Sequence, residues 1–578
     1  MYTRPHVLGR RFNSCLQSSK NFKYRAVPTS HRNVSFLRSM LRSVVQNLAS
    51  PSESDESFFG YTSGRWLFNE PEQLSVRHVT FDVAELKRVA AQAVGAGCCT
   101  RMKKTHEGSF NKIFALEFDN NAELIAKIPT ALIPPFYTTA SEVATMDYAR
   151  TILGLPVPRV LAWNARPDTN VNPVGAEYIL MEKIRGDPLY TRWDGIRGND
   201  MRTVVEQVIN MEQRFVWHRF SQIGSLFYKE DVEPALRDRP LYAAGDADDE
   251  ASERFRVGPL VDWAIWRGSR ASLDIDRGPW PDPLSYIRGI IRIEQQWIRQ
   301  YATPRPPPFH LSAGGDSQTH IDLLERLYAV APHIIPPPQI SQPVLWHTDL
   351  HGANIFLAPS GTPDIVGIID WQGMCLAPLY MQATFAAFLR YSGDAVAMEP
   401  GWVMPKLRVL LESAPAEERP RLEKELRMAK RHKLYEVLVE RGSPHHFASQ
   451  VYPFTGHVVL PTLSASRSWY EGSHHLREAL FRIRSEWADI APGVPLPVAL
   501  EGIDWERHQL DYARKERYEA RAADVARQLG LEGDGLIPSE RYEQVKCMNE
   551  EQLAAWDEEV EGGPYPFQDG APSFFVGS

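Results

Sequence analysis

A polar loop followed by two short apolar runs sets the tightest limits on how this 578-residue chain can fold. Residues 347–354 read HTDLHGAN, the apolar runs 355–357 and 365–369 follow, and Asp370 comes directly after the second run. Two short apolar runs joined by a turn-rich segment are typical of a β-hairpin. We therefore expect a loop of polar side chains, then a hairpin that carries Asp370 at its end.

The polar residues of this loop fit the needs of phosphoryl transfer. That reaction uses a carboxylate that orients and deprotonates the acceptor hydroxyl, together with oxygen ligands for Mg²⁺. Asp349 and Asn354 lie five residues apart and can supply a base and one metal ligand from a single short loop. Asp370 lies sixteen residues beyond Asn354 and can supply the second metal ligand.

The loop resembles the HxDxxxxN element shared by protein kinases and the aminoglycoside and choline phosphotransferases. His347, Asp349 and Asn354 match its three fixed positions, and residues 369–371 (IDW) are similar to the kinase DFG element with Trp in place of Phe. The resemblance implies a bilobal, protein-kinase-like α+β fold that binds ATP and Mg²⁺. It also implies that Asp349 is the catalytic residue and that His347 supports the loop backbone.

The residues up to 182 favour a small β-rich lobe. Alternating apolar residues at 114–118 and a run at 123–128, joined by Asp119-Asn120-Asn121, predict a hairpin. Further elements are predicted from apolar periodicity: helices at 83–94 and from a cap at Thr139 or Ser141, and strands at 160–163 and 178–181.

Helical patterns dominate after residue 182. Asp282 followed by Pro283 predicts a helix start, and apolar stripes indicate two other helices at 205–216 and 323–328. We therefore expect a targeting segment at 1–52, a nucleotide-binding lobe at 53–182 and a helical lobe at 183–578. The helical lobe contains the catalytic loop 345–371 and a C-terminal helical extension.

Two charged residues of the small lobe gain a role from the resemblance. Lys127, in the run LIAKI, stands where kinases carry the strand lysine that contacts the α- and β-phosphates of ATP. Glu142 lies in the following helix, in a position suited to pair with Lys127. Taken singly, each would be interpreted as a solvated surface residue, because exposed Lys and Glu are the commonest case.

The nucleotide-covering loop departs from the kinase pattern. Residues 107–114 read EGSFNKIF, with one glycine where kinases have three, so Ser109 and Asn111 would help Gly108 to hold the phosphates. This departure suggests a small-molecule acceptor rather than a protein. The strand end at Met181 to Lys183 is in the hinge position, where its backbone would contact adenine; Met181 fits a core residue equally well.

The first 52 residues differ in composition from the rest. They contain no Asp or Glu, and arginines are spread among many serines, as in a mitochondrial transit peptide. A basic tail without an import role, or a true start at Met40, would also fit. The formal net charge of -8 argues against nucleic acid as a partner, and no apolar run is long enough to span a membrane. Five cysteines over this length favour a reducing compartment.

Four segments narrow the resemblance to the fungal altered inheritance of mitochondria phosphotransferase-like proteins. They are residues 61–69 (YTSGRWLFN), 108–112 (GSFNK), 139–146 (TASEVATM) and 272–280 (SLDIDRGPW), and the similarity covers about residues 58 to 550. It implies mitochondrial residence but no particular acceptor. Two other functions stay open: a kinase-like scaffold that binds nucleotide without catalysis, and transfer of AMP instead of phosphate.

Overall fold

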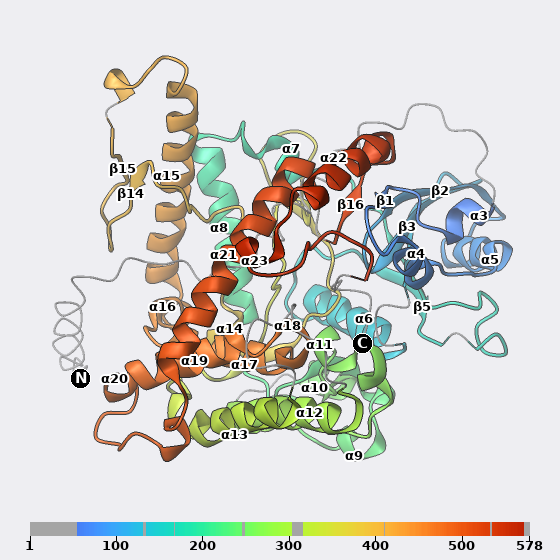
Figure 1. The fold of residues 1–578 in the computed structure, drawn as a ribbon. Coiled ribbons are helices and arrows are strands. Elements are labelled where there is room, and N and C mark those ends of the chain that lie inside the picture. The colour runs from blue at the N-terminus through green and yellow to red at the C-terminus, as the bar shows by residue number, and fades with distance from the viewer. Residues whose placement is uncertain are drawn as a thin grey trace, which may run out of the picture.

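The computed structural model describes residues 55–130, 135–166, 168–245, 249–302, 316–409, 411–531 and 534–570. Figure 1 shows a β-sheet at the right of the molecule and helices over the remainder, with the long helix α15 (Arg419–Gly442) at the far left. The expected targeting segment 1–52 lies outside the described residues. Within them, no helix is long and apolar enough to cross a membrane.

The small lobe is built on a five-stranded antiparallel sheet with strand order β2-β3-β4-β6-β5. Apolar residues of β3 and β4 alternate in burial and pack under α5 (Val83–Ala93), whose N-terminus is capped by Asp82. The predicted hairpin and the two later strands are confirmed. The strands are β2 (Cys99–Glu107), β3 (Asn111–Phe118), β4 (Glu123–Pro129), β5 (Val160–Asn164) and β6 (Tyr178–Glu182).

Helix α6 (Tyr137–Thr151) follows β4 and is buried along most of its length. The expected cap at Thr139 or Ser141 is wrong, because the helix begins at Tyr137 and Phe136 makes no side-chain cap. Thr139 instead donates its hydroxyl to Oε2 of Glu177, at 2.5 Å. Gly154, three residues after the helix, has a φ of 62°, which glycine adopts without steric cost.

The helical lobe contains the three helices predicted after residue 182. Asp282 accepts a hydrogen bond from the Ser285 N–H, as expected for the residue that caps α12. The main helices are α8 (Gly198–Phe215), α12 (Pro283–Tyr301), α13 (Ser317–Ile334), α17 (Thr455–Ala465), α19 (His474–Ser485), α21 (Trp505–Leu529) and α22 (Tyr542–Ala554). Helices α12, α13, α17 and α19 share one apolar core.

The polar loop 347–354 lies between short strands, as its sequence predicts. β11 (Ile355–Leu357) and β12 (Ile365–Ile368) form the expected antiparallel hairpin, and β7 (Asp187–Pro188) adds a third strand beside β11. β10 (Pro343–Leu345) enters the loop and pairs with β13 (Leu376–Pro378), which leaves it. The loop and Asp370 are therefore fixed by backbone pairing on both sides.

The C-terminal region returns to the small lobe. β16 (Leu536–Ile537) pairs with β1 (Arg65–Trp66), and the red C-terminal helices of Figure 1 lie next to the blue strands. Arg77, at the end of α4 (Glu70–Arg77), forms a buried ion pair with Asp534 at 3.2 Å. Residues near both ends of the described chain thus share one structural unit.

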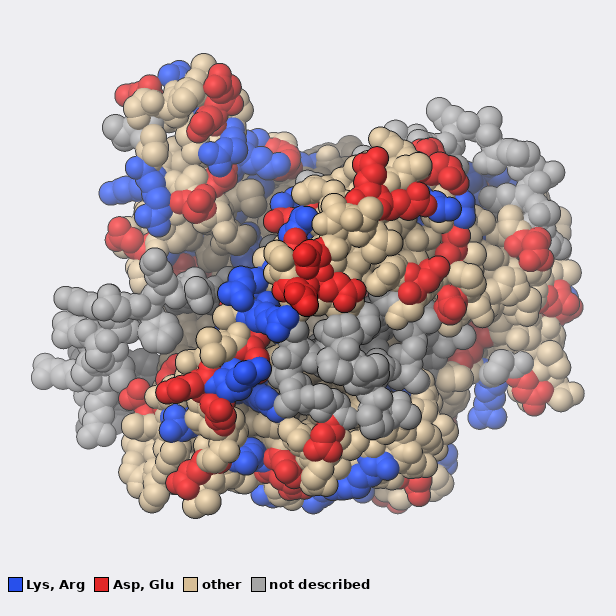
Figure 2. Space-filling view, viewed as in Figure 1, with Lys and Arg blue, Asp and Glu red and all other residues tan. Residues whose placement is uncertain are grey.

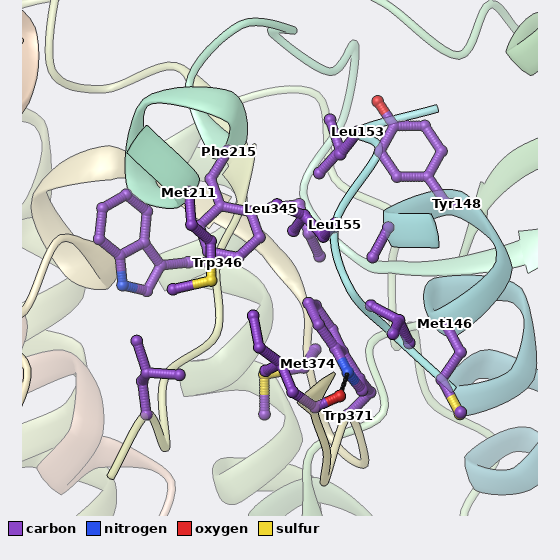
Figure 3. Packing of buried hydrophobic residues seen from close by; sticks show 14 of the residues in the cluster. Met146, Tyr148, Leu153, Leu155, Met211, Phe215, Leu345, Trp346, Trp371 and Met374 are labelled. Atoms are coloured by element: carbon purple, nitrogen blue, oxygen red, sulfur yellow. Dashed lines mark hydrogen bonds between the residues drawn. The ribbon is translucent and has the colours of Figure 1, made fainter. Parts of the chain in front are cut away.

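An apolar core joins α6 to the helical lobe. Figure 3 shows Met146 and Tyr148 of α6 in the same cluster as Phe215, Trp346 and Trp371, and all five side chains are buried. Because this core includes Trp371, the residue after Asp370, the packing of α6 and the position of Asp370 are coupled. A β-rich lobe, a connecting helix and a helical lobe with this loop order confirm the predicted bilobal, protein-kinase-like α+β fold.

Candidate active site

Lys127 and Glu142 form a buried ion pair between the sheet and α6. The Lys127 Nζ lies 2.7 Å from Oε1 and 2.8 Å from Oε2 of Glu142, and both side chains are almost fully buried. Lys127 reaches α6 because β4 is central in the sheet, with Ile113 on one side and Ile179 on the other. Burial raises the pKa of the Glu142 carboxyl, and the neighbouring Lys127 opposes that shift.

Asp370 lies on the other side of Lys127. Its Oδ1 is 3.9 Å from the Lys127 Nζ, and its side chain is 41% exposed, so the carboxylate remains open to a ligand. Asp370 has a φ of 65°, a conformation that costs a non-glycine residue on the order of 1 kcal/mol or more. The flanking residues hold it there: the Trp371 Nε1 donates to the Ile368 carbonyl at 3.0 Å, and the Ile369 N–H donates to the Asn354 carbonyl at 3.0 Å.

Asn354 is tied to Asp349 within the polar loop. Its Nδ2 donates to the backbone carbonyl of Asp349 at 3.0 Å, so its side-chain oxygen is left for another partner. Asn354 is buried, whereas the side chain of Asp349 is 42% exposed. The geometry gives one accessible carboxylate at Asp349 and two further oxygen donors at Asn354 and Asp370.

Two histidines support this loop. The His347 Nε2 lies 3.0 Å from the Ile369 carbonyl, and its ring packs edge-on against Trp371 with centroids 4.9 Å apart. His347 therefore supports the backbone, as the sequence suggested. His351 was not predicted; its Nδ1 accepts from the Ala353 N–H at 3.2 Å, and its Nε2 lies 3.7 Å from Oδ2 of Asp349. The sequence signal for His351 was its position inside the loop motif at 347–354.

The charges around Asp349 act on its pKa in opposite directions. Burial raises the pKa of the Asp349 carboxyl, His351 and His347 lower it, and Asp370 raises it, with a net upward shift. Burial lowers the pKa of His347, which favours the neutral ring at neutral pH. The loop therefore offers a carboxylate whose proton affinity is higher than that of a free aspartate.

Gly108 and Ser109 lie in the loop between β2 and β3, and Asn111 is the first residue of β3. The Gly108 N–H donates to the Asn111 carbonyl at 2.9 Å, and the Thr130 N–H donates to the Phe110 carbonyl at 2.8 Å. The Asn111 Nδ2 donates to Oε1 of Gln372 at 2.6 Å, two residues beyond Asp370. This contact, which the sequence analysis missed, joins the loop of the small lobe directly to the helical lobe.

Glu107, at the end of β2, is a further residue that the sequence analysis missed. It is buried and accepts hydrogen bonds from the Thr62 N–H (2.5 Å), the Thr62 hydroxyl (2.9 Å) and the Ser63 hydroxyl (3.0 Å). It also lies 2.8 Å from the Lys104 Nζ and 3.5 Å from the Lys112 Nζ. Burial raises the pKa of the Glu107 carboxyl. The two lysines and the Thr62 N–H lower it by more than burial raises it, so the net shift is downward. Burial also lowers the pKa of Lys112, to about 8.

The hinge residues take different positions. Met181 lies on β6 in register with Ile125 and Val160, and its side chain belongs to the apolar core. Lys183 follows the strand, and its Nζ lies 2.7 Å from Oε1 of Glu123. The side chains of both residues are therefore engaged, so any contact with adenine would use the backbone after β6.

The oxygen donors fit a magnesium ion that is shared with phosphates. Mg²⁺ prefers hard oxygen ligands and is often held by one or two side chains plus substrate phosphates and water. Asn354 and Asp370 supply an amide oxygen and a carboxylate next to Lys127, which is a donor set of this kind. Across the described ranges, no cluster of three or more His, Cys, Asp or Glu residues forms a metal site made of protein ligands alone.

Residues 293–401 match the sequence profile of the phosphotransferase enzyme family, designated APH. This span contains the polar loop, its hairpin and Asp370. A subtelomeric hrmA-associated cluster protein of Aspergillus fumigatus is 36% identical over 329 residues, which cover 51% of this chain and 62% of that relative. The chain thus spans less than two thirds of the length of this curated relative.

Relatives of a second kind are named mitochondrial, and one of them aligns over more of the chain. The mitochondrial altered inheritance of mitochondria protein 9 of Yarrowia lipolytica is 23% identical over 492 residues, which cover 79% of this chain and 81% of that protein. A protein with the same name from Zygosaccharomyces rouxii is 27% identical over 51% of this chain and 51% of its own length. The resemblance to this fungal family that the sequence suggested is thereby confirmed.

Two solved structures align with low similarity. A putative fructosamine-3-kinase of Thermobifida fusca is 15% identical, with 69% of this chain and 100% of that chain covered and a TM-score of 0.32. The aminoglycoside phosphotransferase APH(4)-Ia is 11% identical, with 70% and 99% covered and a TM-score of 0.34.

Proposed function

We propose that this chain, which carries a domain of the phosphotransferase enzyme family, transfers the γ-phosphoryl group of ATP to a hydroxyl group of a small molecule. One observation carries the proposal: the buried Lys127–Glu142 pair lies 3.9 Å from Asp370, whose backbone is bonded through Ile369 to Asn354. These elements come from distant parts of the sequence. A fold without phosphoryl-transfer chemistry has no physical need to bring them together.

Lys127 binds the α- and β-phosphates of ATP in this proposal. Glu142 holds the ammonium group in place from α6, so that little reorganisation is needed when the nucleotide arrives. The turn at Gly108, Ser109 and Asn111 covers the phosphates, and the backbone from Met181 to Lys183 contacts adenine. The carboxylate of Asp370 balances the charge of Lys127 from the side of the cleft.

Asn354 and Asp370 would hold Mg²⁺, which when bound neutralises charge on the phosphates. Asp349 orients the acceptor hydroxyl and takes its proton as the new oxygen–phosphorus bond forms. The bond between the γ-phosphorus and the bridging oxygen breaks in line, and ADP leaves. His351 lies beside Asp349 and stabilises its carboxylate before the proton is taken.

Mitochondrial residence is part of the same proposal. It is supported by the relatives that carry mitochondrial names and by the basic, acid-free composition of residues 1–52. A fluorescent protein fused after residue 52 should appear in mitochondria. A diffuse cytosolic signal would remove this part of the proposal without touching the catalytic part.

The catalytic part is tested by phosphate release from ATP with water as the acceptor. Asp349→Asn in the full chain should lower the rate by about 10²-fold or more, because the base is lost, while ATP still binds. Asp364→Asn, on the exposed turn between β11 and β12, is the matched control and should keep the wild-type rate. ATP binding without phosphate release in the wild type, also with a range of alcohols, would favour a nucleotide-binding scaffold.

A further inference from the structure

A cavity of about 680 Å³ lies in the helical lobe, apart from the proposed ATP site. Its walls come from α9 (Pro234–Arg237), α11 (Trp263–Trp266), residues 275–281 and the first turns of α12. None of Lys127, Glu142, Asp349, Asn354 and Asp370 lines it. The volume is within the range of about 300–1,000 Å³ that is usual for small-molecule sites.

The charge on the walls of this cavity is mainly positive. Its lining includes four arginines, at positions 239, 277, 288 and 292, against the two carboxylates of Glu233 and Asp276. Among the residues that the structure describes, none of these arginines lies within ion-pair distance of a carboxylate. Figure 2 shows lysine and arginine side chains along the lower edge of the molecule, where α12 runs in Figure 1.

Both carboxylate oxygens of Asp276 accept hydrogen bonds from its own loop. Its Oδ1 accepts from the Gly278 N–H at 2.9 Å, and its Oδ2 accepts from the Trp280 Nε1 at 3.0 Å. These bonds fix Trp280 against α12 at Gly289, where an added Cβ would lie 2.6 Å from the indole nitrogen. The wall is therefore built around Trp280 and has a defined shape before any ligand enters.

A second part of the wall is aromatic. The rings of Tyr137 and Trp266 lie 4.9 Å apart with an angle of 35° between their planes. The Arg277 guanidinium lies over Trp266 at 4.1 Å from the ring centroid. On α12, Arg288 lies over the Tyr328 ring at 4.6 Å, and the Arg292 Nη2 donates to the Tyr328 hydroxyl at 3.1 Å. The Arg277 Nη2 also donates to the backbone carbonyls of Arg270 and Leu273. Stacking and these bonds orient the guanidinium groups, and an anion would bind the N–H groups that they leave unused.

We propose that this cavity binds an organic phosphate, with its phosphate group on the arginines and a planar ring against the aromatic wall. Arginine binds phosphate through paired N–H groups, and four such side chains suit a doubly charged phosphomonoester. The aromatic wall adds contact area for a ring. This site does not depend on the proposed phosphoryl transfer, because none of its residues belongs to the ATP cleft.

Phenyl phosphate is a suitable probe, since it carries both groups. Calorimetry on the full chain should show saturable binding of phenyl phosphate, with phenol and inorganic phosphate each binding at least 10-fold more weakly. The double variant Arg288→Met/Arg292→Met should bind phenyl phosphate at least 10-fold more weakly than the wild type. Arg299→Met, on an exposed part of the same helix, is the matched control and should bind as the wild type does.

Two further variants keep the test decisive. Asp370→Ala should still bind phenyl phosphate, because it alters only the proposed ATP cleft. Arg239→Met changes an exposed loop residue of the cavity and should weaken binding several-fold without affecting folding, even if the double variant fails to fold. No binding to the wild type, equal binding after the arginine substitutions, or loss of binding in Asp370→Ala would each overturn the proposal.

Discussion

The Thr62 N–H donates a hydrogen bond to Oε1 of Glu107 at 2.5 Å, which joins the segment before β1 to the start of the proposed phosphate loop. The Ser63 hydroxyl donates to the same oxygen, and Lys104 donates to Oε2 at 2.8 Å and to two backbone carbonyls of the 57–60 segment. A kinase loop with three glycines relies on backbone freedom to approach the phosphates. Here the loop has one glycine, and the buried hydrogen bonds and ion pairs of Glu107 fix its start.

Substitution of Glu107 by Gln should weaken both stability and ATP binding. Lys104 and Lys112 would be left buried without a carboxylate, which costs on the order of 3–5 kcal/mol. We expect a lower midpoint of thermal unfolding and about 10-fold weaker ATP binding, both measurable on the purified full chain. Glu117→Gln on the same hairpin removes a 47% exposed partner of Arg101 and serves as the control. Equal effects of the two substitutions would contradict the role of Glu107.

Substitution of Glu142 by Gln should lower the rate of turnover more than it weakens the binding of ATP. Lys127 would lose the partner that fixes its ammonium group, and misplacement of such a group by about 1 Å can cost 10²-fold in rate. Phosphate release from ATP measures the effect. Glu206→Gln, which breaks the exposed pair with Arg202 on α8, is the control. An unchanged rate in Glu142→Gln would contradict the role of Glu142 in positioning Lys127.

The loop and its hairpin could be predicted because their signals are local. Residues 347–354 carry a fixed spacing of polar side chains, and the apolar runs of β11 and β12 lie next to the loop in the sequence. The strand around Lys127 could be predicted from its apolar run, but the role of Lys127 followed from the resemblance to the kinase strand lysine. The pairing with Glu142 needed the resemblance, because fifteen residues and a helix start separate the two side chains.

Other parts of the structure have no local signal. β2 was missed because residues such as Lys103, Lys104 and His106 interrupt any apolar alternation, and only Met102 and Glu107 are buried. The Asn111–Gln372 contact and the β1–β16 pair join segments hundreds of residues apart, which no local pattern reports. Glu107 appears as an ordinary polar residue until the fold surrounds it with two lysines.

Loss of the Asn111–Gln372 contact should change nucleotide exchange. Gln372→Leu removes the acceptor of the Asn111 Nδ2. The Asn111 side-chain amide is then left without this hydrogen bond, which costs about 1–3 kcal/mol. Since this bond joins the two lobes, we expect faster release of a fluorescent ATP analogue in a stopped-flow experiment, by several-fold. Gln318→Leu, on an exposed turn of α13, is the control. A release rate equal to that of the wild type would show that the bond does not hold the lobes together.

Glu212 of α8 should make stability depend on pH. Burial raises the pKa of this carboxyl from 4.5 to about 8, although the Tyr435 hydroxyl donates to its Oε2 at 2.7 Å. The folded chain therefore binds a proton that the unfolded chain has lost above about pH 4.5, and its contribution to stability falls as pH rises from about 4.5 to 8. The slope approaches about 1.4 kcal/mol per pH unit.

Glu212→Gln should remove this contribution. Urea unfolding between pH 5 and 8 measures the slope for the wild type and the variant. The variant should show a flatter dependence on pH and a gain in stability relative to the wild type at the alkaline end. Parallel slopes for the two proteins would contradict a proton on Glu212 in the folded state.

ATP binding that depends on Mg²⁺ tests the proposed cleft most directly. Calorimetry on the full chain should show binding of ATP with Mg²⁺ that weakens at least 10-fold when the metal is chelated. The Asp370→Ala variant should lose this dependence, whereas Asp364→Ala, an exposed residue on the adjoining turn, should keep it. Absence of ATP binding in the wild type, or a dependence on Mg²⁺ that survives in Asp370→Ala, would contradict the assignment of Lys127, Asn354 and Asp370 to a nucleotide site.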